Sequence, residues 1–351
     1  MHCTYDIEKT YRENYESGPN LPPDVGSVPP TPTKRFMGFE LNSRLGIAAG
    51  LLLNSKWIAA YSRLGYDLLT YKTVRRSYRP CYPLPNWVFV TDDGALKGPI
   101  YRSHRGHQTD HQITSAVCFG MPSMAPEVWR KDVAVARNAL SSGQRLIVSV
   151  VATPEEGWGI TEIAEDFARC ALWAKEAGAD IVEANLSCPN VCTAEGSIYL
   201  DPDFSHEVAA TLRERISNTP LLLKIGYFEE PDGLAEFLNR IDGVVDGVTM
   251  VNGITRPVLE LDGRPVFGPS YEKAGVLGRA IHPASVQSVA FAREVILRDQ
   301  LDLEILAVGG AALVDDIEDF FQAGAGAVLM GSSPMYRPLL AIEAKQAHPR
   351  W

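Results

Sequence analysis

The feature that most constrains the fold is an alternation of short apolar runs and amphipathic segments that begins near residue 36. The apolar runs have the length and composition of buried strands, and the segments between them show helical spacing. Strands that alternate with helices form parallel βα units. The expected strands are 45–49, 68–74, 113–119, 146–152, 181–186, 221–225, 247–251, 304–308 and 327–331. The expected helices lie at about 55–64, 127–141, 161–177, 204–217, 231–241, 283–298, 313–322 and 334–346.

Eight βα units close into a barrel of roughly 250 residues. The sequence therefore predicts a TIM (β/α)8 barrel over residues 36–351, preceded by an irregular, loosely packed N-terminal extension over 1–35. A doubly wound open sheet is the alternative, but it would usually carry a Gly-x-Gly-x-x-Gly turn after its first strand, and none is present there. The stretches 76–112 and 256–274 interrupt the alternation, and such insertions usually shape a pocket or lid.

The composition argues against several classes of function. The formal net charge is −10, from 33 basic and 43 acidic residues, which disfavours nucleic-acid binding and attachment to anionic membranes. No apolar run reaches the roughly 18 residues of a transmembrane helix, and the N-terminus lacks a signal-peptide core. The six cysteines include no Cys-x-x-Cys pair, so no metal site is expected, and their scatter fits the cytoplasm. We interpret His104, His107 and His111 as exposed loop residues rather than metal ligands.

Residues 185–190 carry the densest chemistry in the chain. They read Asn-Leu-Ser-Cys-Pro-Asn and follow the apolar run at 181–184. Polar groups at the carboxyl end of a barrel strand are placed where active sites form. Amides orient planar polar ligands, and the thiol of Cys188 can act as an acid, a base or a nucleophile. The alternative interpretation of Cys188 is a small buried apolar residue. Cys192, nearby, is interpreted as a spare loop thiol.

Two further kinds of signal stand at strand ends. Lys72 and Lys224 each lie inside or at the end of an apolar run, where a lysine either meets an anionic ligand or extends its ammonium to solvent. Gly309-Gly310 and Gly331-Ser332 end the last two expected strands, each before a helix. Glycines there let a phosphate approach the backbone N–H groups, although they are also common in ordinary βα turns.

These motifs follow the order seen in dihydroorotate dehydrogenases. The shared set is Ala48-Ala49-Gly50, Lys72, the hexad at 185–190, Lys224, Asn252, Gly309-Gly310 and Gly331-Ser332. Over about residues 36–346 the chain resembles the soluble, cysteine-using branch of that family. The hexad is highly specific, and the glycine motifs support it. A similar hexad with a cysteine acid occurs in the pyrimidine-reducing domain of dihydropyrimidine dehydrogenase.

The resemblance implies a cytoplasmic, homodimeric FMN enzyme of pyrimidine biosynthesis that acts on a small molecule and oxidises (S)-dihydroorotate to orotate. Flavin N5 would exchange a hydride with one carbon while Cys188, assisted by Lys72, exchanges a proton with the neighbouring carbon. The expected cofactor contacts are Ala48, Ala49, Gly50, Lys72, Asn185, Lys224, Asn252, Gly275, Gly278, Gly309, Gly310, Gly331 and Ser332. The expected substrate contacts are Lys72, Asn185, Asn190, Asn252 and Gly253.

The chain departs from the family pattern on the substrate side. Val117 and Ser123 stand where the family usually has asparagines, and Gly253 stands where a hydroxyl residue is common. His282 replaces a frequent lysine. Since valine cannot hydrogen-bond a uracil-like ring, a diverged enzyme with another substrate is an open alternative. The arginines of the 76–112 insertion are candidates for binding a substrate carboxylate.

Two alternatives from other classes remain at this level. One is a barrel that binds flavin or phosphate without turnover. The other is a phosphate-sugar aldolase or isomerase in which Lys72 or Lys224 forms a Schiff base. A purified protein without yellow colour would favour the second of these alternatives.

Overall fold

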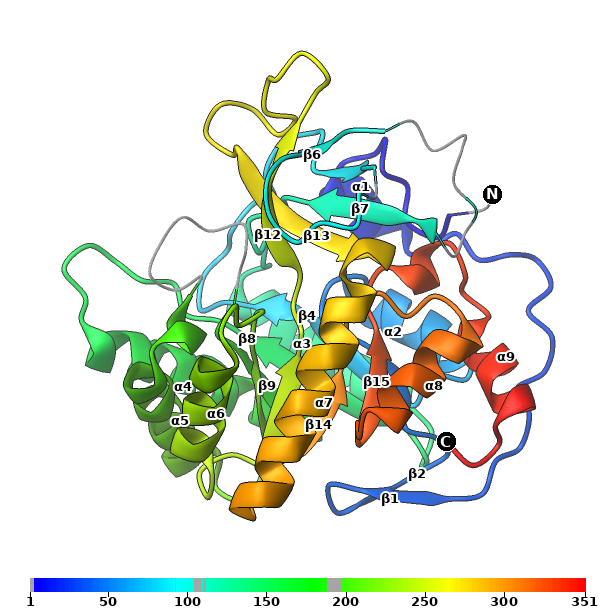
Figure 1. Ribbon diagram of the computed structural model, residues 1–351. Coiled ribbons are helices and arrows are strands. Elements are labelled where there is room, and N and C mark those ends of the chain that lie inside the picture. The colour runs from blue at the N-terminus through cyan, green and yellow to red at the C-terminus, as the bar shows by residue number, and fades with distance from the viewer. Residues whose placement is uncertain (1–2, 92, 104–108, 110–111, 188–196) are drawn as a thin grey trace.

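The computed structural model describes residues 3–91, 93–103, 109, 112–187 and 197–351. Eight parallel strands close into a barrel, and their order around it follows the chain (Figure 1). They are β3 (Leu45–Ile47), β4 (Leu68–Val74), β8 (Arg145–Val150), β9 (Ile181–Asn185), β10 (Leu221–Lys224), β11 (Gly247–Met250), β14 (Glu304–Ala307) and β15 (Ala327–Met330). The predicted TIM barrel is therefore confirmed, and the open sheet is excluded.

Helices surround the barrel on its outer side (Figure 1). They are α2 (Ser55–Ser62), α3 (Pro126–Asn138), α4 (Ile160–Glu176), α5 (Pro202–Ile216), α6 (Pro231–Ile241), α7 (His282–Asp299), α8 (Val314–Gln322) and α9 (Leu340–Ala347). Seven of them lie close to the predicted ranges. The last begins later than expected, because Pro338 interrupts the segment and Ser333–Met335 forms a short 3-10 turn instead.

The apolar run at 113–119 is a strand, but it does not belong to the barrel. It forms β7 (Thr114–Val117), which pairs antiparallel with its neighbours in a separate five-stranded sheet. We call this sheet the cap sheet. Its order is β5 (Trp87–Phe89), β7, β13 (Lys273–Gly278), β12 (Ile254–Leu259) and β6 (Ile100–Tyr101). The two predicted insertions thus combine into one sheet, which lies over one end of the barrel in Figure 1.

The N-terminal extension is more ordered than its composition indicates. It contains α1 (Tyr11–Ser17), which begins with a capping box between Thr10 and Glu13. Tyr5 is fully buried, and its ring packs against that of Trp57 on α2. This differs from the loose chain expected, although the Thr-x-x-Glu spacing was a readable helix signal. The extension's C-terminal part enters a hairpin of β1 (Lys34–Phe36) and β2 (Phe39–Leu41).

A buried arginine holds the loop at 93–99 against the cap sheet. Arg256 on β12 is only 2% exposed. Its guanidinium donates to both carboxylate oxygens of Asp93, at 2.9 and 2.8 Å, and to the carbonyl oxygens of Ala95, Gly98 and Pro99. These hydrogen bonds from Arg256 are the largest cause that lowers the pKa of Asp93 to about 2. The loop at 93–99 is therefore held to β12 by a charge-assisted pair.

Replacing Asp93 with asparagine should lower the melting temperature at neutral pH, because the guanidinium of Arg256 then loses its carboxylate partner. Since folding lowers the pKa of Asp93, its contribution is fully present above its usual pKa of about 4 and is lost as the pH falls toward 2. The two proteins should therefore converge in acid. Thermal unfolding followed by circular dichroism at several pH values checks this. Asp262→Asn, which breaks an exposed local pair with Arg264, serves as the control.

Among the described residues, no helix combines the length and the apolar character needed to cross a membrane.

Candidate active site

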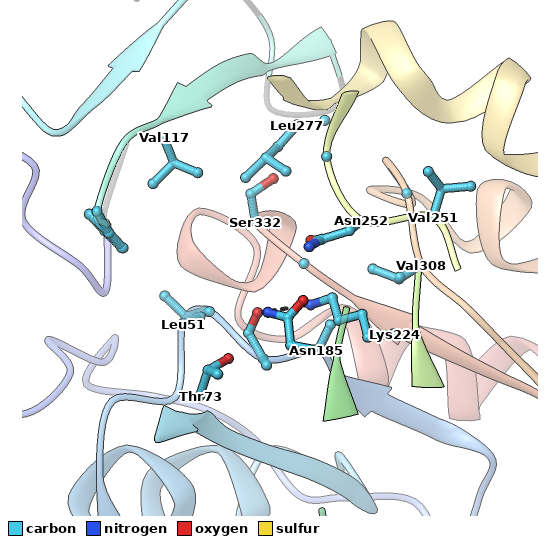
Figure 2. A pocket seen from close by; sticks show the side chains of 18 of the residues that line it. Leu51, Thr73, Val117, Asn185, Lys224, Val251, Asn252, Leu277, Val308 and Ser332 are labelled. Atoms are coloured by element: carbon cyan, nitrogen blue, oxygen red, sulfur yellow. Dashed lines mark hydrogen bonds between the residues drawn. The ribbon is translucent and has the colours of Figure 1, made fainter. Parts of the chain in front are cut away.

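A pocket lies at the carboxyl ends of the barrel strands, between the barrel and the cap sheet. Figure 2 shows Val117 and Leu277 from the cap sheet on one side, and Asn185 and Lys224 from the barrel on the opposite side. The space encloses about 920 Å³, part of it open to solvent. Of the residues expected at the site, the pocket is lined by Ala48, Ala49, Gly50, Lys72, Asn185, Lys224, Asn252, Gly253, Gly278, Gly309, Gly310, Gly331 and Ser332.

Other expected site residues do not line this pocket. Gly275 lies on β13, paired with Val117 and Thr255, and it is not among the lining residues. Cys188 and Asn190 lie outside the described residues, as do Cys192 and the three histidines of the 76–112 insertion. The expectations for these residues stay predictions.

Two buried lysines give the pocket its charge. Lys72 is 7% exposed and Lys224 is 3% exposed. The ammonium of Lys224 donates to the carbonyl oxygen of Ala49 at 3.3 Å, so its side chain crosses from β10 toward the end of β3. Both lysines reach the cavity because they occupy inward-facing positions at strand ends. Ammonium groups placed this deep favour an anionic or strongly polar ligand.

Two asparagines fix the residue that precedes Cys188. The side-chain oxygen of Asn185 accepts a hydrogen bond from the backbone N–H of Ser187 at 3.2 Å. The side-chain amide of Asn252 donates to the carbonyl oxygen of Ser187. Asn185 also directs its amide at the sulfur of Met121, at 3.7 Å. The two amides therefore fix the backbone of Ser187, the last described residue of this stretch.

The glycines after β14 let the backbone approach its neighbours closely. Gly310 has φ +86°, and a Cβ there would lie 2.4 Å from the carbonyl oxygen of Gly278. Gly309 has φ +144°, and a Cβ there would lie 2.1 Å from Oγ of Ser285. No other residue type fits either position without displacing atoms. Gly309 and Gly310 therefore present bare backbone to the pocket, which Ser332 also lines, and we call this surface the glycine wall. Backbone N–H groups on such a surface can bind a phosphate.

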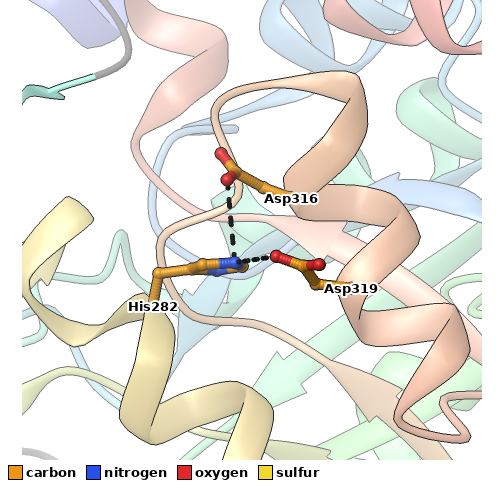
Figure 3. Close-up of side chains that lie close together, drawn as sticks. All are labelled: His282, Asp316 and Asp319. Carbon is orange, nitrogen blue, oxygen red and sulfur yellow. Dashed lines mark hydrogen bonds and ion pairs between the residues drawn. The ribbon is translucent and has the colours of Figure 1, made fainter.

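His282 supports this wall from behind. Its Nδ1 lies 3.2 Å from the carbonyl oxygen of Gly309, and its Nε2 lies 3.1 Å from Asp319 and 3.7 Å from Asp316 (Figure 3). Asp316 already accepts hydrogen bonds from two backbone N–H groups at the start of α8 and from Arg279. We therefore assign this group a structural role that joins the glycine wall to α8, rather than a metal site.

Sequence analysis did not identify most of the apolar residues that line the pocket. Trp87, Phe119 and Leu277 line the pocket from the cap sheet or next to it, and Met121 follows. No local signal identified them, because their place over the barrel depends on long-range strand pairing. Val117, where an asparagine was expected, does line the pocket, so its apolar side chain is part of the wall. Ser123, the other replaced position, is not among the lining residues.

Two described cysteines are poor candidates for acid–base work. Burial is the largest cause that raises the pKa of Cys81 to about 12. Burial also raises the pKa of Cys170 far above its usual value. A thiol with so high a pKa stays protonated near neutrality. Neither residue lines the pocket.

Comparison with known proteins identifies the family. A family model described as dihydroorotate dehydrogenase matches residues 118–344. A dihydroorotate dehydrogenase from Dictyostelium discoideum is 31% identical over 359 residues, covering 97% of this chain and 95% of that protein. The catalytic subunit of dihydroorotate dehydrogenase B (NAD(+)) from Bacillus cytotoxicus is 28% identical over 161 residues, covering 45% of this chain and 49% of that protein.

A solved structure agrees on the fold. The crystal structure of DHODH from Eimeria tenella in complex with ferulenol superposes with a TM-score of 0.71 at 18% sequence identity, covering 93% of this chain and 85% of that chain. At this identity the likeness concerns the barrel architecture. With the family match and the near full-length relative, it leads to one conclusion: the chain belongs to the dihydroorotate dehydrogenase family.

Proposed function

We propose that this protein is an FMN-dependent oxidoreductase that acts on a CH–CH group of a small carbonyl or amide substrate. The first substrate to test is (S)-dihydroorotate, with orotate as product. The observation that carries the proposal is the convergence of Lys72, Lys224, Asn185 and Asn252 with the glycine wall in one pocket, in a chain of the dihydroorotate dehydrogenase family.

The residues of the pocket fit a flavin mononucleotide. Gly309, Gly310 and Gly331 line the pocket without side chains, which suits a phosphate bound by backbone N–H groups. Leu277 offers apolar surface to a flat ring. Lys224 supplies a positive charge for a ring system that becomes more negative on reduction.

The bound flavin would supply a hydride acceptor at N5. We assign the remaining work to side chains of this chain. Lys72, Asn185, Asn190 and Asn252 orient the substrate's polar groups, and Gly253 contacts the substrate through its backbone. Cys188, as thiolate, takes the proton from one substrate carbon while the neighbouring carbon gives up its hydride, so that a C–C single bond becomes a double bond. In the reverse direction Cys188 returns the proton.

A second candidate is a diverged enzyme of the same chemistry that acts on a different substrate. The observation that favours it is Val117, whose side chain lines the pocket and has no hydrogen-bonding group. Trp87 and Phe119 extend this apolar wall. A substrate that meets this wall would be less polar there than a uracil-like ring, since a polar edge facing it would lose its hydrogen bonds with water.

The test is to add candidate substrates to the purified protein without oxygen and to record the flavin absorbance. We expect a yellow protein with one FMN per chain. Its flavin absorbance should be bleached by dihydroorotate or by another of the candidate substrates. Bleaching by other compounds alone would select the diverged enzyme. A yellow protein that no compound bleaches would favour the non-catalytic barrel, and a colourless one would favour the aldolase or isomerase alternative.

A further inference from the structure

The barrel interior contains a carboxylate that no described residue satisfies. Glu183 on β9 is completely buried, and neither of its oxygens has a hydrogen-bond partner in the described part of the chain. Its neighbours along the strand show which way it points. Asn185 lines the pocket and Ile181 packs in the inner cluster with Leu222, so Glu183 between them also faces inward. It therefore lies one layer beneath the pocket floor.

The same layer holds further polar groups. Ser149 on β8 is the register partner of Glu183. Its hydroxyl lies 3.1 Å from that of Thr73, which lines the pocket. Thr70 on β4 and Thr249 on β11 are buried as well, and their hydroxyls have no partner among the described residues. Barrel interiors are usually filled with branched aliphatic side chains at this level, so a polar layer calls for an explanation.

The buried lysines of the pocket supply a reason for the buried carboxyl group of Glu183. A carboxylate in an apolar interior is strongly unfavourable unless a compensating charge lies nearby. Glu183 pairs in register with Leu222, and Lys224 lies two residues further along the same strand. That geometry separates the Cα atoms of Glu183 and Lys224 by about 8 Å, on the same inner face. Lys72 stands in the layer above, two residues after Thr70 on β4.

We propose that Glu183 is a positioning residue whose carboxylate serves as the internal counter-ion of Lys224 and Lys72. This inference rests on the proposed function, because the positive charges of the two lysines would act on the bound flavin. With Glu183 ionised, the pocket holds one positive charge in place of two. The carboxylate would thereby make the reduced, negatively charged flavin less stable and lower the reduction potential of the site.

The experiment compares the midpoint potential of the flavin in the wild-type protein and in Glu183→Gln, by anaerobic titration against a redox dye. The substitution keeps the shape and removes the charge. At a fixed solution potential we expect the ratio of reduced to oxidised flavin to rise by about tenfold, which for this two-electron couple corresponds to about 30 mV. Thr249→Val, which changes the same layer without changing its charge, should leave the potential where it is.

A second matched pair guards against misfolding of a single variant. Glu183→Asp and Glu183→Asn have the same size and differ in charge, so the asparagine variant should show the higher potential. Equal potentials within both pairs would overturn the inference, since Glu183 would then be neutral in the folded protein. An equal shift in Thr249→Val would overturn it too, by pointing to repacking. A wild-type protein without flavin would instead overturn the proposed function, and this inference with it.

Discussion

Replacing Cys188 with alanine is expected to slow the reduction of bound flavin by substrate by roughly 10²–10⁴-fold, the usual contribution of a positioned acid or base. Alanine cannot accept the substrate proton, so the C–C bond cannot lose its hydride and its proton together. The flavin should remain bound, because the glycine wall and Lys224 are unchanged. Ser187, the preceding residue, keeps its hydrogen bonds with Asn185 and Asn252.

Stopped-flow measurement of flavin bleaching under anaerobic conditions tests this. The wild-type rate should rise with pH as the thiol ionises, and the alanine variant should lose that dependence. Cys192→Ala is the matched control, since it removes a nearby thiol from the same stretch and should reduce at the wild-type rate. A Cys188→Ala protein that bleaches as fast as the wild type would refute the assignment of Cys188 as the proton carrier.

Replacing Gly310 with alanine is expected to destabilise the protein by about 2–5 kcal/mol and to reduce the amount of FMN that copurifies with it. Two effects contribute. A left-handed backbone costs a residue with a Cβ about 1–2 kcal/mol. The added carbon would lie 2.4 Å from the carbonyl oxygen of Gly278 and 2.8 Å from Cβ of His282, and such overpacking typically costs about 1–3 kcal/mol. The backbone shift that relieves this contact would displace the wall of the pocket.

Gly331→Ala supplies the control from the same pocket. Gly331 lines the cavity too, but a Cβ there would meet only a methyl group of Val308, at 3.8 Å, which is an ordinary contact. Urea unfolding should therefore separate the two variants, with Gly331→Ala near the wild type and Gly310→Ala well below it. If both variants unfold at the same urea concentration, the close approach at Gly310 does not limit stability.

The barrel itself was predictable because each βα unit has a recognisable local sequence pattern. Apolar runs and amphipathic helices recur with the right lengths, and eight such units have one common way to close. The run at 113–119 shows the limit of this reasoning. Its pattern matches a barrel strand, yet β7 pairs antiparallel in the cap sheet. Local sequence reports that a segment is extended and buried, whereas the choice of partner depends on contacts with residues far along the chain.

The candidate site divides in the same way. Lys72, Asn185, Lys224 and Asn252 were identifiable because strand ends in a barrel converge on one face, whichever strand they terminate. The sequence identified His282 only as a departure from the family pattern, and its Nδ1 lies 3.2 Å from the carbonyl oxygen of Gly309. Its importance comes from where α7 begins relative to the glycine wall, and that placement is a property of helix packing.

The sequence by itself determined the barrel, the chemistry of the strand ends and the family resemblance, because strand-end positions and motif order are properties of short segments. Only the tertiary structure decided what surrounds that chemistry. The cap sheet assembles from 87–117 and 254–278 to place Trp87 and Val117 over the lysines. The run 181–184 contains Glu183, and only the closed barrel removes its carboxyl group from water, one layer beneath Lys224.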